Sequence, residues 1–107
     1  MTDNFKMIYH ILSSLEEQMD KEKVDISKFD HEQLGVSKER WLNYIIMMED
    51  AGYITGVSIK KNIYDEILFD GKDMRITIKG LEYLSENSIM QRMYKIAKGI
   101  KDVTPGI

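Results

Sequence analysis

The first pattern along the chain is an apolar stripe with steps of three and four residues, the period of one face of an α-helix. Its members are Phe5, Ile8, Ile11, Leu12, Leu15 and Met19. Thr2 or Asp3 can cap the start of this helix, and a charged run over residues 20–23 follows it. The stripe therefore predicts an N-terminal helix of about four turns that packs into the core.

The middle of the chain has the pattern of two helices joined by a tight turn. Residues 24–26 alternate like a very short strand, and Asp30 then begins a capping box. Gly35 supplies the left-handed residue that closes a short helix, and the Ser37 hydroxyl can cap the next one. The predicted buried face of that second helix consists of Trp41, Tyr44, Ile45 and Met48.

Next, the period changes to two, which predicts a β-hairpin. Residues 53–60 form the first expected strand, with Gly56 at a bend or a close backbone approach. Asp70 and Gly71 are a turn signal, and residues 74–77 return as the partner strand. Residues 62–69 leave two alternatives, because they could extend a long hairpin or fold back as a small extra strand.

Two further helices are expected after the hairpin. Thr77 ends the returning strand, and its hydroxyl can accept a bond from the backbone N–H of Lys79 or Gly80. Gly80 costs about 1 kcal/mol of helix propensity relative to Ala, which favours a close approach of this turn to a neighbour. Asn87 and Ser88 offer a break, and a last amphipathic helix follows with the stripe Ile89, Met93, Ile96 and Ile100.

The order of these elements is that of a winged helix, an α+β fold in which three helices precede a hairpin. A chain of 107 residues suits one core. We expect a single domain over residues 1–107, with a winged-helix core at 1–78 and a C-terminal helical extension at 79–103.

Three segments together carry a narrower resemblance: FKMIYHILSSLE, LGVSKERWLNYIIMMEDAGYITGV and RITIKGLEYLSENSIMQRMYKIAKGIKDVTPGI. The chain resembles the YjcQ-like family of small bacterial and prophage proteins over nearly its whole length. This resemblance implies a winged helix in a bacterial or phage-derived protein. The biochemical role of that family is not established, so the resemblance supplies no catalytic residues.

One hypothesis for function is DNA binding in transcriptional control, because a winged helix can lay its second helix in the major groove. The candidate contacts are Lys38, Arg40 and Asn43 on that helix and Lys60, Lys61, Lys72 and Arg75 on the wing. Against it, Glu39, Glu49 and Asp50 would repel phosphates, and residues 53–78 carry four basic and four acidic side chains. The net charge of the chain is −3.

The alternative hypothesis is a protein-interaction or dimerisation module on the same scaffold. Apolar side chains on an exposed helix face suit a protein partner better than a base edge. The candidate interface residues are Leu42, Ile46 and Met47 on the second helix and Met93, Ile96 and Ile100 on the last one. The last stripe could instead pack on the N-terminal helix.

Other classes of function find little support in the sequence. The chain has no cysteine and only two histidines, His10 and His31, which lie in separate elements. Paired carboxylates, a serine with a base, and a phosphate-binding glycine loop are not evident. We therefore expect a non-enzymatic protein without cofactor, metal or small-molecule substrate. No run of 18 apolar residues occurs, so we also expect a cytoplasmic protein with no membrane partner.

Overall fold

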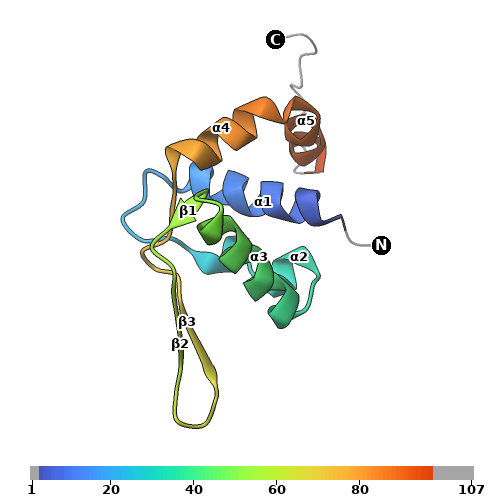
Figure 1. The fold of residues 1–107 in the computed structure, drawn as a ribbon. Coiled ribbons are helices and arrows are strands. Elements are labelled where there is room, and N and C mark those ends of the chain that lie inside the picture. The colour runs from blue at the N-terminus through green and yellow to red at the C-terminus, as the bar shows by residue number, and fades with distance from the viewer. Residues whose placement is uncertain (1–2, 98–107) are drawn as a thin grey trace.

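Helices and two small antiparallel sheets make up the computed structural model, which describes residues 3–97 (Figure 1). The elements in chain order are α1 (Asn4–Glu17), a single 3-10 turn (Ile26–Lys28), α2 (His31–Leu34), α3 (Lys38–Asp50), β1 (Ile54–Thr55), β2 (Ser58–Lys61), β3 (Ile67–Asp70), β4 (Arg75–Ile76), α4 (Ile78–Glu86) and α5 (Ser88–Ala97). The predicted α+β class is confirmed.

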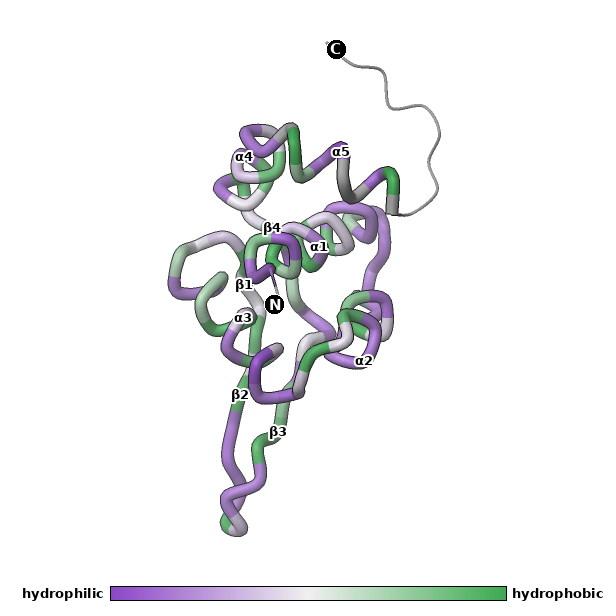
Figure 2. The backbone as a smooth tube through the Cα atoms, turned by 90° about the vertical axis from the view of Figure 1, so that its right-hand side faces the viewer, coloured by the Kyte–Doolittle hydropathy of each residue, from purple (hydrophilic) through white to green (hydrophobic). Residues whose placement is uncertain are grey.

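Helix α1 lies at the centre of the fold, with α3 on one side and α4 and α5 on the other (Figures 1 and 2). Asp3 caps it by accepting bonds from the backbone N–H groups of Phe5 and Lys6. The middle of its predicted stripe is buried, but Phe5 and Met19 are 62% and 55% exposed. Burial at these two positions was wrongly predicted. Phe5 lies in the uncovered first turn, and Met19 lies beyond Glu17, where helical spacing no longer applies.

The predicted turn between α2 and α3 is confirmed in detail. Asp30 Oδ1 accepts from the N–H of Gln33 at 2.8 Å, and Gly35 has φ 71°. Ser37 Oγ accepts from the N–H of Arg40 at 3.1 Å, which satisfies one of the free donors at the start of α3. The predicted inner face of α3 is buried, as expected: Trp41, Tyr44, Ile45 and Met48.

The short strand predicted at residues 24–26 is wrong, because a buried side chain binds the backbone there. Gln18 Oε1 accepts from the N–H of Asp25 at 2.6 Å, and Gln18 Nε2 donates to the Asp25 carbonyl at 3.3 Å. The Asp25 carboxylate then accepts from the N–H of Ser27 and starts the 3-10 turn. Only one bond joins this segment to the hairpin, from the N–H of Val24 to the carbonyl of Lys72.

Of the two alternatives for residues 62–69, the structure has the long hairpin, but its chain reversal is not at the predicted place. β2 pairs with β3 and β1 pairs with β4, so residues 67–70 extend the hairpin. The turn lies at residues 62–66, where Asn62 Oδ1 accepts from two backbone N–H groups. The hairpin therefore does not reverse at Asp70 and Gly71 as predicted. A turn does begin there, where the N–H of Met74 donates to the Gly71 carbonyl at 3.0 Å and the N–H of Lys72 donates to Asp70 Oδ1 at 3.1 Å. Gly56 has φ 82° and lies against the carbonyl of Asp73, which confirms the predicted close approach.

The joint between hairpin and α4 is confirmed. Thr77 donates its backbone N–H to the Tyr53 carbonyl at 3.0 Å, as a strand residue would. Its Oγ1 accepts from the N–H of Gly80 at 3.1 Å and donates to the Gly52 carbonyl at 2.6 Å. One residue thus ends the ladder and caps the helix.

Candidate functional site

The outer face of α3 carries two exposed apolar side chains, Ile46 and Met47, among polar ones. Its members are Glu39, Asn43, Ile46, Met47 and Asp50, which are all exposed and recur at helical spacing. Ile46 and Met47 are 42% and 50% exposed, and the face holds two carboxylates and no lysine or arginine. It therefore combines apolar contact area with negative charge.

Leu42 does not belong to this face. The sequence placed it among the candidate interface residues, but it is only 6% exposed and lies in the core cluster. The neighbouring elements bury a larger part of the α3 surface than the predicted stripe of four residues, and this part includes Leu42. This candidate is therefore wrong, whereas Ile46 and Met47 are accessible.

Arg40 is held against the start of α1. Its Nε donates to the Tyr44 hydroxyl at 3.0 Å, and its Nη2 donates to Asn4 Oδ1 at 2.9 Å. The Tyr44 hydroxyl donates to the same Asn4 oxygen at 2.6 Å. Two of the guanidinium N–H groups are thus engaged inside the protein. The hydrogen bonds of the described residues engage neither of the other two predicted α3 contacts, Lys38 and Asn43, through its side chain.

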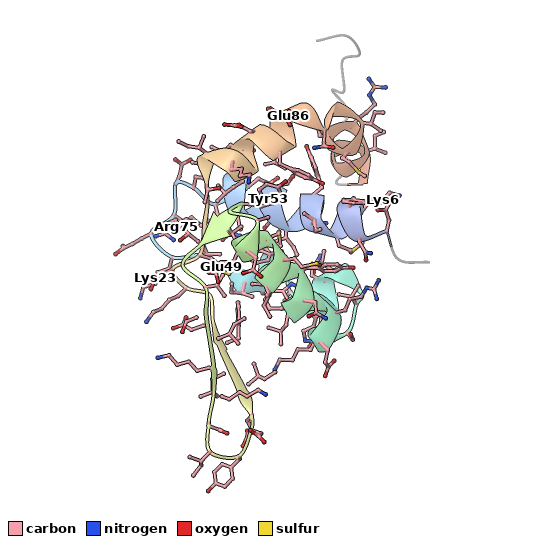
Figure 3. All side chains as sticks on the ribbon, viewed as in Figure 1. Lys6, Lys23, Glu49, Tyr53, Arg75 and Glu86 are labelled. Atoms are coloured by element: carbon pink, nitrogen blue, oxygen red, sulfur yellow. The ribbon has the colours of Figure 1, made fainter. Side chains whose placement is uncertain are left out.

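The four predicted cations of the hairpin fall into two pairs. Lys60 and Lys61 are exposed, and the strand register places them on opposite faces. Lys72 lies 3.9 Å from the Asp70 carboxylate, and Arg75 donates to the carbonyls of Met74 and Glu22. Figure 3 shows Arg75 at the base of the hairpin on the side of Lys23. The structure brings together no compact cluster of free cations from the seven candidates.

A groove of about 400 Å³ lies between β3 and the helices, and we call it the β3 groove. It is lined by Ile26, Asp30, His31, Lys38, Trp41, Ile67, Leu68 and Phe69. Trp41 and Phe69 make an edge-to-face contact with ring centroids 5.0 Å apart. Sequence reasoning missed this groove because its lining comes from four separate segments.

A second cavity, of about 320 Å³, lies between α1, α4 and α5, and residues Tyr9, Leu81 and Gln91 are in its lining. Burial raises the pKa of Tyr9 and of the neighbouring Tyr83 above its ordinary value. On α5, Ile96 is exposed, while the Met93 side chain and all of Ile100 lie outside the described residues. Dimerisation through this stripe stays a prediction.

Within residues 3–97, no group of three or more His, Cys, Asp or Glu side chains could hold a metal ion. In the same range, none of the helices has both the length and the apolar character needed to cross a membrane.

A family model described as YjcQ protein matches residues 9–103. The chain belongs to the YjcQ protein family. The match confirms the resemblance inferred from the sequence, and in this YjcQ protein it includes all of α3, the hairpin and the β3 groove. No curated protein and no solved structure matched the chain.

Proposed function

We propose that this YjcQ protein is a winged helix that uses α3 to bind another protein. The fold assignment is supported by the tight α2–α3 turn through Gly35 and by the hairpin that follows α3. In this scheme, α1 to α3 are the helical body and β2 with β3 is the wing. The two C-terminal helices cover the side of α1 away from α3.

The outer face of α3 carries this proposal. A base-reading helix needs donors toward the groove, but Glu39 and Asp50 here would lie toward phosphates. In a DNA groove the apolar side chains of Ile46 and Met47 would remain in contact with water. A protein surface would instead remove their apolar area from water. The chemistry of the face therefore fits a partner with an apolar centre and basic groups around it.

Met47→Glu is expected to abolish capture of the partner while leaving the fold intact. A buried carboxylate at the centre of an interface carries a large desolvation cost, so we expect affinity to fall at least about 30-fold, or about 2 kcal/mol. Tagged protein would be incubated with lysates of bacteria that encode it, and captured proteins would be compared by quantitative mass spectrometry.

Met19→Glu is the matched control, because Met19 is as exposed as Met47 but lies after the end of α1. We expect this variant to retain the proteins that Met47→Glu loses. Equal loss in both variants, or no loss in Met47→Glu, would contradict the use of the α3 face.

A second candidate function is DNA binding along the hairpin. Lys60 and Lys61 favour it, because both are exposed on a projecting element. In the described hairpin the ion pair is Lys72 with Asp70, and it involves neither Lys60 nor Lys61. Such contacts would be to the backbone and not specific for sequence.

The DNA candidate predicts salt-dependent binding of a labelled non-specific duplex. Each phosphate contact adds about −0.9 to the slope of log affinity against log salt, so Lys60→Glu with Lys61→Glu should reduce the steepness by roughly two. Lys6→Glu with Lys21→Glu makes the same charge change at exposed lysines away from the hairpin. Absence of binding at low salt, or equal loss in both double variants, would remove this candidate.

A further inference from the structure

One edge of the hairpin has unused backbone hydrogen-bonding groups. In an antiparallel ladder, opposed residues alternate between pairs that bond each other and pairs whose N–H and C=O groups point outward. Asn62 donates to the Glu66 carbonyl, which makes them a bonded pair. The register then makes Lys61 with Ile67 an outward-pointing pair and Lys60 with Leu68 a bonded one.

On β3, the groups of Ile67 and Phe69 therefore point away from β2. Strand β3 pairs only with β2, and no backbone bond from another described element reaches Ile67 or Phe69. A backbone bond from outside the hairpin lies at its base, where the N–H of Val24 donates to the carbonyl of Lys72 in the turn after β3. Beyond that point no backbone bond from the other described elements reaches this edge, and in Figure 2 the strand labelled beside β3 is its hairpin partner β2.

The two edges of the hairpin differ in how they are protected. Lysine side chains protect an edge strand against pairing, and β2 carries Lys60 and Lys61. Strand β3 instead carries Ile67 and Leu68, which are both exposed, and its only charged residue is Asp70 at the end. The unprotected edge is thus the one that borders the β3 groove.

The β3 groove can accept side chains of a strand that pairs with the β3 edge. Trp41 and Phe69 form an aromatic wall, while His31, Lys38 and Asp30 provide polar groups around it. Strand addition gains affinity from main-chain bonds and specificity from pockets for alternate side chains. An open edge next to a pocket of about 400 Å³ has both elements.

We infer that an extended segment of a partner protein adds to β3 as a third strand and places one apolar side chain in the β3 groove. This inference rests on the proposed function, because it names how the partner docks. The alternating N–H and C=O groups of the β3 edge complement another polypeptide backbone, which also has both donors and acceptors. A DNA phosphate offers only acceptors, and a lipid chain offers neither donors nor acceptors.

The test uses a phage-displayed library of random dodecapeptides selected on the full chain. We expect enriched peptides with alternating apolar residues, whose binding is then measured by titration against two variants. Ile67→Pro removes an outward N–H without removing a bond to β2, and we expect about tenfold weaker binding. Lys61→Pro is the matched control, because it removes the outward N–H of the opposed residue on the other edge.

Binding to Lys61→Pro should stay within about twofold of the unchanged chain, with retained fold checked by circular dichroism. On peptide binding, amide hydrogen exchange at Ile67 and Phe69 should slow, while exchange at Lys61 should not. The inference would be overturned if no peptides were enriched, or if the two proline variants weakened binding equally. It would also be overturned if the chain formed a dimer that Ile67→Pro dissociates. Loss of partner capture by Met47→Glu but not by Ile67→Pro would overturn strand addition alone and leave the α3 proposal standing.

Discussion

Replacement of Trp41 by alanine is expected to lower the free energy of unfolding by about 3 to 5 kcal/mol. Trp41 is 3% exposed and lies between the rings of Phe29 and Phe69, at centroid distances of 6.5 and 5.0 Å. Its Nε1 donates to the Phe29 carbonyl at 2.8 Å. The substitution would leave a large cavity and a buried carbonyl without its donor, and both effects destabilise.

Urea denaturation followed by circular dichroism would measure this loss, because the chain has one tryptophan and its fluorescence would disappear with it. Trp41→Phe keeps most of the aromatic area but not the N–H, so we expect a smaller loss, near 1 to 3 kcal/mol. The hairpin amides should also exchange faster in Trp41→Ala, since the contact to Phe69 anchors β3. A loss below about 1 kcal/mol would contradict this account.

The helices could be predicted because their signals are local. Asp30, Ser37 and Thr77 each bond a backbone N–H three residues ahead. Such a cap is visible in the sequence whatever surrounds it. The spacing of apolar residues likewise predicted the inner face of α3 and the exposure of Ile46 and Met47.

The errors arose where distant segments decide the outcome. Residues 24–26 have a strand-like pattern, but Gln18 occupies the backbone groups of Asp25. No local feature marks a glutamine as buried. The hairpin turn was misplaced because Asp70 and Gly71 are a common turn signal, whereas Asn62 closes the actual turn with its side chain.

The same reason limits prediction of the candidate site. Arg40 was a reasonable DNA contact by position, but Asn4, 36 residues away, binds its guanidinium. The open edge of β3 follows from the register of one hairpin, and the β3 groove needs the helices to be placed beside it. Composition and spacing predict which side chains are exposed, while their partners depend on tertiary structure.

Gly80→Leu is expected to destabilise the protein by about 3 kcal/mol, although leucine is the better helix former. A Cβ atom at this buried position would lie 2.5 Å from the Tyr53 carbonyl oxygen and 2.7 Å from Ile76 Cγ1. That carbonyl already accepts from the N–H of Thr77, so it cannot move without opening the β1–β4 ladder. The gain in helix propensity, about 1 kcal/mol at most, does not offset this overlap.

Thermal unfolding would measure the effect, and a loss of this size should lower the Tm by at least about 10 °C. Glu82→Leu adds the same residue at an exposed position of α4 and should change stability by less than about 0.5 kcal/mol. Gly71→Ala is a sharper comparison, because the three atoms nearest to its Cβ would belong to the side chains of Ile26, Phe69 and Met74 and not to backbone. We therefore expect a smaller loss there than in Gly80→Ala, where the new atom meets backbone. An unchanged Tm in Gly80→Leu would show that this turn has room, and the glycine would then need another explanation.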